Sequence, residues 1–231
     1  EALLAYDILS KGLEVLDDTV MLNNSSDSAR VMFVKLQQQR ALALAQSGAS
    51  KEARHILRKL YHQGADDGET LGILGRTLKD MASTETKLQR RGEILREAFE
   101  IYHQAYGTAL KRKNIDQAYY TGVNAASLAL FIGDMQTCRT LAGEVKTLCQ
   151  EKLNENEENP SYWLFATLGE AELLLGNQKT AKTYYQKAAG RALRSFRDIA
   201  SMRKQASAIL KETGADDTWL DGSLQLPTVV A

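Results

Sequence analysis

Proline is scarce in this chain of 231 residues, where only Pro160 and Pro227 occur. Because proline removes a backbone N–H and clashes with the preceding turn, its scarcity leaves long stretches in which a helix can continue. These stretches are rich in Ala, Leu, Lys, Gln and Glu, which favour helix. Strict alternation of apolar and polar residues is nearly absent as well, which argues against an all-β fold.

Cysteine is equally scarce, with only Cys138 and Cys149 in the chain. They are too few for a disulfide framework and lack the spacing of a metal site, so they indicate two thiols in an intracellular protein. No apolar run approaches the roughly 20 residues that span a bilayer, and no signal-peptide pattern opens the chain. We therefore expect a cytoplasmic protein that does not enter a membrane.

An excess of charge of either sign is also missing, since 29 Lys and Arg balance 29 Asp and Glu. A general nucleic-acid binder usually carries a basic surplus, because neutralising phosphates supplies most of its affinity. The balance argues against that class. Two short basic runs, at 89–91 and 111–113, flank one predicted helix. They indicate either contact with an acidic partner or nucleic acid, or a solvated helix end.

Apolar residues recur at three- and four-residue spacing almost throughout the chain, which is the period of amphipathic helices. Short turns marked by Gly, Asn and Asp join most of these segments, so consecutive helices should pack antiparallel. The pattern predicts helices over residues 2–16, 28–47, 50–63, 69–83, 91–110, 115–132, 135–153, 161–175, 178–194 and 196–212.

The helix pairs repeat when they are aligned on the glycines that end a helix. Gly133 and Gly176 are 43 residues apart, and Gly48 precedes Gly133 by 85 residues, almost two such periods. The repeat predicts a stacked array of helical hairpins.

Small and bulky residues alternate around the last of these glycines. Gly169, Ala181 and Ala188 should let the two helices of a hairpin approach closely. Phe165 and Tyr185 should fill the space between hairpins. We expect this hairpin to be tightly packed.

This pattern resembles the tetratricopeptide repeat (TPR), although Glu172 replaces the usual bulky apolar residue. Weaker copies surround Gly48 and Gly133, and a further unit pairs residues 71–78 with 96–105 across an insertion. The resemblance implies an all-α fold, a right-handed superhelix of about nine or ten helices in antiparallel pairs.

Two segments are similar to the TRAFs-binding domain, a helical-repeat module of apoptosis signal-regulating kinases and of bacterial multidomain proteins. They are "ETLGILGRTLKD" (69–80) and "AYYTGVNAASLALFIGD" (118–134). The resemblance implies a non-catalytic regulatory role, but the adaptor partner does not transfer because no short motif carries it. We expect a repeat domain over residues 1–213, and a tail over 214–231 that links this fragment to a further domain. The tail ends in an apparent incoming strand.

No constellation of catalytic or ligating residues is evident. The glycines of "GETLGILG" (68–75) lack the spacing and the lysine of a phosphate loop, and they fit close helix packing instead. His55 and His62 could share a helix face, but no third ligand is suitably spaced, and His103 is isolated. The sequence therefore predicts no catalytic, cofactor or metal site and no enzyme activity.

In a stacked array the first helix of each hairpin lines the concave face. Asn124 occupies a place where some TPR domains use asparagine to grip a carboxylate, but the matching sites hold Gln39 and Thr167, so that clamp is incomplete. Counting back from the turn glycines, and aligning "LGILG" for the second repeat, predicts this lining, with Asn124 at its margin. The predicted partner contacts are Lys35, Gln38, Arg76, Lys79, Tyr120, Asn124, Ser127, Trp163 and Glu170. Cation and aromatic contacts could hold an extended or helical segment there. The alternative is that Tyr120 and Trp163 pack against neighbouring helices.

Two functions from different classes follow. The first is a scaffold module of a larger signalling protein that binds a protein segment, or a neighbouring domain of its own chain, in the concave groove. The second is a repeat domain that senses a small molecule or nucleotide and gates an attached effector domain. An enzyme is the third and least supported reading.

Overall fold

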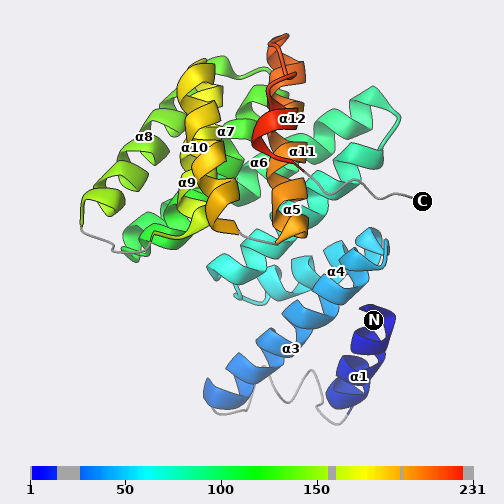
Figure 1. The fold of residues 1–231 in the computed structure, drawn as a ribbon. Coiled ribbons are helices and arrows are strands. Elements are labelled where there is room, and N and C mark those ends of the chain that lie inside the picture. Colours follow the sequence, from blue (N-terminus) through cyan, green and yellow to red (C-terminus); the bar gives the residue numbers. More distant parts are fainter. Residues whose placement is uncertain (1, 15–26, 156–159, 193–194, 226–231) are drawn as a thin grey trace. The chain divides into compact units, whose positions relative to one another are not determined.

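A computed structural model describes residues 2–14, 27–155, 160–192 and 195–225 of the chain. Every regular element in these ranges is a helix, and none is a strand (Figure 1). All ten helices expected from the periodicity are present, so the all-α helical-repeat fold is confirmed. The strand expected at the C-terminal end falls mostly on residues 226–231, outside the described part.

The chain divides into two compact units, Glu1–Thr108 and Ala109–Ala231, which are described separately. The first unit holds α1 (Ala2–Glu14), α3 (Asp27–Gln46), α4 (Ser50–His62), α5 (Gly68–Thr84) and most of α6 (Leu88–Lys111), in the numbering of Figure 1. Its core joins α1, α3 and α4 through the buried side chains of Leu13, Phe33 and Leu60. Helix α5 packs on both α3 and α4.

The second unit is organised around α9, which packs against α7, α8, α10 and α11. Its helices are α7 (Ile115–Phe131), α8 (Met135–Asn154), α9 (Tyr162–Leu174), α10 (Gln178–Ala192), α11 (Phe196–Thr213) and α12 (Leu220–Ser223). The helix α9 is buried almost all round, which explains why its sequence is so apolar.

The short helix α12 was not expected from the sequence. It lies in the segment interpreted as a tail and packs on α10, where Leu220 and Leu224 are buried. The ring of Trp219 lies 6.1 Å from that of Tyr185. The division of the chain at residue 213 into a repeat domain and a linker stays a prediction.

The aligned glycines all end their helices in the left-handed conformation, which a residue without a side chain adopts most easily. The φ angles of Gly48, Gly133 and Gly176 are 91°, 85° and 85°. After Gly133 the N–H of Asp134 donates to the carbonyl of Ala129 across 2.9 Å, which closes the last turn. The interpretation of these glycines as helix ends is confirmed.

The same turn ends α6 without a glycine. Lys113 has a φ of 54°, and the N–H of Asn114 donates to the carbonyl of Ala109 across 2.9 Å. The left-handed conformation places the Cβ of an ordinary residue close to the following carbonyl oxygen. This turn therefore contains local strain that the glycine turns avoid.

Two helical glycines lie directly under a buried tyrosine ring, whereas the repeat pattern placed Tyr185 between hairpins and predicted only the close packing at Gly169. A Cβ atom added to Gly75 would lie 2.5 Å from the ring of Tyr102, and one added to Gly169 would lie 3.0 Å from the ring of Tyr185. Both tyrosines are buried. Close packing thus joins α5 to α6 and α9 to α10 in the same way.

Candidate functional site

The residues predicted to contact a partner fall into two sets, one in each unit. In the first unit they lie on α3 and α5, which pack together. Lys35 and Arg76 are exposed, Lys79 is half-buried, and Gln38 is buried. The exposed members of this set are therefore cationic.

Gln38 joins the two helices instead of facing solvent. Its Nε2 donates to Oγ1 of Thr70 across 2.8 Å and to Oδ1 of Asp67 across 3.1 Å. Asp67 also accepts from the backbone N–H groups of Glu69 and Thr70, and so caps the start of α5. The Gln38 amide thus holds α3 against the first turn of α5.

In the second unit the most exposed members of the set are two aromatic residues. Tyr120 is 40% exposed and Trp163 is 42% exposed, and they occupy equivalent positions near the starts of α7 and α9. The ring of Trp163 lies 4.9 Å from that of Tyr162. The hydroxyl of Tyr162 donates to Oδ2 of Asp198 across 2.8 Å, which ties this end of α9 to α11.

The remaining members of this set make contacts within the chain. Asn124 is half-buried, and its Nδ2 donates to the carbonyl of Tyr120 across 2.8 Å. Ser127 is fully buried. On α11, Nε2 of Gln205 donates to Oγ of Ser127 across 2.9 Å and to Oε1 of Glu170 across 2.8 Å.

Helix α11 therefore covers part of the face that α7 and α9 were expected to present to a partner. Sequence reasoning missed Gln205 because the repeat alignment stopped at Gly176. Gly214 could have extended the repeat alignment to α11. It ends α11 with a φ of 66° and continues the series of turn glycines.

A hollow of mixed charge in the first unit was not predicted. It measures about 640 Å³ and is lined by Arg54, Lys87, Gln89, Arg90, Glu93, Ile94 and Glu97. Its charges are partly neutralised, because Glu97 pairs with Arg54 and the Nε of Arg90 lies 3.3 Å from Oε2 of Glu85. The basic run at 89–91, noted from the sequence, was the available signal.

The histidines and cysteines are dispersed or inert. All three histidines are exposed, and the described ranges contain no group of three or more His, Cys, Asp or Glu that could hold a metal ion. Burial raises the pKa of Cys138 to about 11 and that of Cys149 to about 12. Such thiols are poor nucleophiles. Among the helices described, none has the length and apolar character to cross a membrane.

The comparisons with known proteins agree with this architecture. A solved structure of a thermophilic TPR protein from Thermus thermophilus matches with a TM-score of 0.55 and 14% identity, over 89% of each chain. At that identity the likeness concerns the fold alone. No curated protein matches the chain. A family model described as Tetratricopeptide Repeats-Sensor matches residues 5–129, more than half of the sequence. The chain therefore belongs to the Tetratricopeptide Repeats-Sensor family.

Proposed function

We propose that this chain is a non-catalytic interaction module of a larger signalling protein. It binds a protein segment, or a neighbouring domain of the same chain, through the first helices of its hairpins. The observation that carries the proposal is the exposure of Lys35 and Arg76 on two packed helices of a TPR-family chain. TPR-like repeats generally serve as protein-interaction scaffolds.

The residue types at these positions suit protein recognition. Arginine, tyrosine and tryptophan are the side chains that most often dominate binding energy at protein interfaces. Arg76, Tyr120 and Trp163 are all exposed. In the first unit an acidic side chain of a partner would pair with Arg76. In the second unit apolar side chains of a partner would cover the two rings.

The similarity of residues 69–80 and 118–134 to the TRAFs-binding domain supports the regulatory side of the proposal. In apoptosis signal-regulating kinases that module is regulatory and non-catalytic. A role in signalling and a cytoplasmic location are both part of the proposal.

A charge-reversal experiment tests the cationic set. The double variant Arg76→Glu, Lys79→Glu should recover a cross-linked partner or neighbouring domain about tenfold less efficiently than the native chain. The control is Lys51→Glu, Arg96→Glu, which reverses two exposed cations of the same unit outside the set. Unchanged recovery by the first variant, with its helical circular dichroism intact, would rule the cationic set out.

A second candidate function is supported by the hollow at Lys87 and Arg90 and by the word "Sensor" in the family description. In this alternative, the hollow binds an anionic small molecule or nucleotide that gates an attached effector domain. A panel of such compounds should then raise the melting temperature, and Lys87→Ala with Arg90→Ala should abolish the rise. A panel without any effect on the native chain would contradict this candidate.

A further inference from the structure

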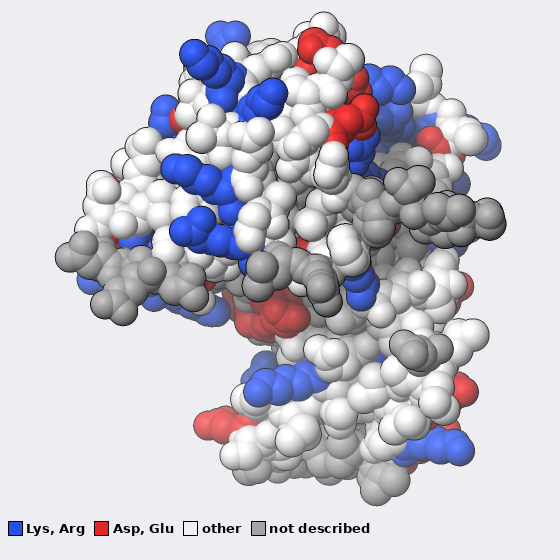
Figure 2. All heavy atoms as spheres, in the orientation of Figure 1, with Lys and Arg blue, Asp and Glu red and all other residues white. Residues whose placement is uncertain are grey.

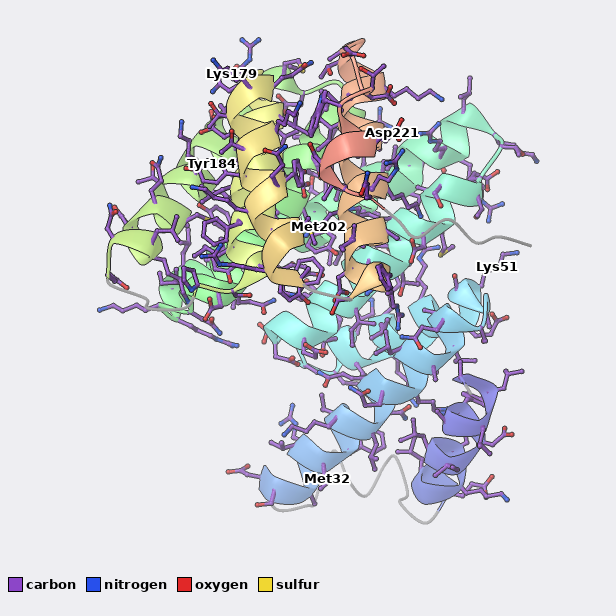
Figure 3. The ribbon with its side chains drawn as sticks, in the orientation of Figure 1. Met32, Lys51, Lys179, Tyr184, Met202 and Asp221 are labelled. Carbon is purple, nitrogen blue, oxygen red and sulfur yellow. The ribbon has the colours of Figure 1, made fainter. Side chains whose placement is uncertain are left out.

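Helix α10 carries charge of only one sign. It contains Lys179, Lys182, Lys187 and Arg191 and no Asp or Glu, and all four cations are exposed. Figure 2 shows Lys and Arg atoms at intervals down the surface over α10, and Figure 3 labels Lys179 at the start of this helix. None of the four forms an ion pair with another residue of the described ranges. We call these four residues the α10 basic face.

Two of these cations share one aromatic support. The guanidinium carbon of Arg191 lies 4.6 Å from the ring centroid of Phe165 on α9, and Nζ of Lys187 lies 6.0 Å from the same centroid. Lys187 also lies 5.7 Å from the ring centroid of Tyr184. The rings of Phe165 and Tyr184 stack with centroids 6.4 Å apart. These contacts fix both charges at one place on the surface.

The arrangement has an electrostatic cost that an anion would remove. Lys187 and Arg191 are one helical turn apart, where like charges repel by a few tenths of a kcal/mol. Attraction to the ring faces holds the cations in place, worth about 0.5–1 kcal/mol at exposed sites. Because the ring contacts favour these side-chain positions before binding, we expect less conformational entropy to be lost when a ligand pairs with both.

We propose that the α10 basic face docks an acidic polypeptide segment. The four cations extend over about 18 Å, at about 1.5 Å per helical residue. Lys187 and Arg191 are about 6 Å apart along the axis, close to the roughly 6.8 Å between alternate side chains of an extended chain. A segment with Asp or Glu at every second position therefore matches this pair.

The surroundings favour a polypeptide over other polyanions. The exposed residues of α10 include no large apolar side chain that could enter a bilayer, as an interfacial helix requires. Phe165 is 6% exposed and lies beneath the cations, so its ring is not open to stacking with a nucleotide base. An acidic polypeptide segment needs neither an apolar side chain that enters a bilayer nor an exposed ring for stacking. Its carboxylates need only the positive charges of the α10 basic face.

The test uses the full 231-residue chain and a fluorescent peptide of alternating Glu and Ser as the probe. Fluorescence anisotropy should show binding that weakens as salt rises. Lys187→Glu with Arg191→Glu should lower the affinity about tenfold or more. The matched control is Arg139→Glu with Lys211→Glu, which makes the same charge change at two exposed cations elsewhere in the unit.

A second variant, Lys187→Gln with Arg191→Gln, covers the case in which the reversed chain does not fold. It should also weaken binding while the control retains the native affinity. The inference is overturned if both variants bind the acidic peptide as the native chain does. It is equally overturned if the native chain binds only oligothymidylate or phosphatidylserine vesicles. The Arg76→Glu, Lys79→Glu variant should bind this peptide normally, so the two proposals fail separately.

Discussion

Nζ of Lys146 on α8 lies 3.0 Å from Oε1 of Glu172 on α9. Glu172 is only 3% exposed, and its Oε2 accepts a 2.7 Å hydrogen bond from Nδ2 of Asn177. This carboxylate occupies the position where the repeat pattern usually has a bulky apolar side chain. The structure thus accounts for the departure, because both oxygens of the buried group have partners.

Replacing Lys146 alone should destabilise the fold more than replacing both Lys146 and Glu172. Lys146→Met leaves Glu172 buried without its cation, and we expect the free energy of unfolding to fall by about 1–3 kcal/mol. Urea denaturation at neutral pH measures the change. The double variant Lys146→Met, Glu172→Leu should recover most of the loss. A single variant as stable as the native chain would show that the pair contributes nothing.

A methyl group at Gly75 should destabilise the first unit. Gly75→Ala places Cβ 2.5 Å from the buried ring of Tyr102, and overpacking of this kind costs about 1–3 kcal/mol. Gly107→Ala is the control, because a Cβ there meets nothing within 4 Å and should stabilise α6 by about 0.5–1 kcal/mol. The stability of Gly169→Ala should lie between the stabilities of these two variants. Thermal unfolding of the three variants would reveal any other order.

A glycine should improve the turn that ends α6. Lys113→Gly removes the strain of a side chain at a φ of 54°, and after the entropy that glycine adds to the unfolded chain we expect a gain of about 0.5–1 kcal/mol. The opposite exchange, Gly133→Ala, should lose about 1 kcal/mol at an equivalent turn. A drop in melting temperature for Lys113→Gly would contradict this explanation.

The thiols of Cys138 and Cys149 should not react until the chain unfolds. Burial raises the pKa of Cys138 to about 11 and of Cys149 to about 12, so almost no thiolate forms below pH 9. We expect no reaction with a disulfide reagent such as DTNB in the native protein and two equivalents in urea. Rapid reaction without denaturant would show that these side chains are accessible.

The same pKa shift gives stability an alkaline dependence. The folded pKa of Cys149, about 12, exceeds the ordinary value near 9, so the unfolded chain loses its thiol proton first as pH rises. The thiol's contribution is therefore fully present below pH 9 and is lost progressively towards pH 12. Urea denaturation across this range should show a smaller decline for Cys149→Ala than for the native chain. Equal declines would exclude the thiol as a cause.

Most of the fold was predictable because its signals are local. The glycine turns at Gly48, Gly133 and Gly176 and the close-packing glycine at 169 can be recognised from spacing alone, but the tyrosine ring that covers it was expected between hairpins. The covering of Ser127 by Gln205 could not, because the two residues are 78 positions apart and meet only after α11 packs on α7 and α9.

The charged surfaces were harder to predict for a related reason. Basic runs such as 89–91 and 111–113 can be recognised in the sequence because their residues are consecutive. The cations of α10 are spaced along the helix, between Lys179 and Arg191, and they gather on the surface only when the helix forms. The support of Arg191 by Phe165 adds a contact between helices that no single segment contains.

The hydrogen bonds of Gln205 affect how the second unit unfolds. In a simple repeat array each hairpin contacts only its neighbours. The stabilities of the hairpins and of their interfaces then add along the chain, and the ends unfold independently. Gln205 bonds to Ser127 and Glu170 at once and therefore couples α11 to two helices from earlier hairpins. Local unfolding of α11 must break both hydrogen bonds. The unfolding of α11 is therefore coupled to the packing of α7 as well as to that of α9.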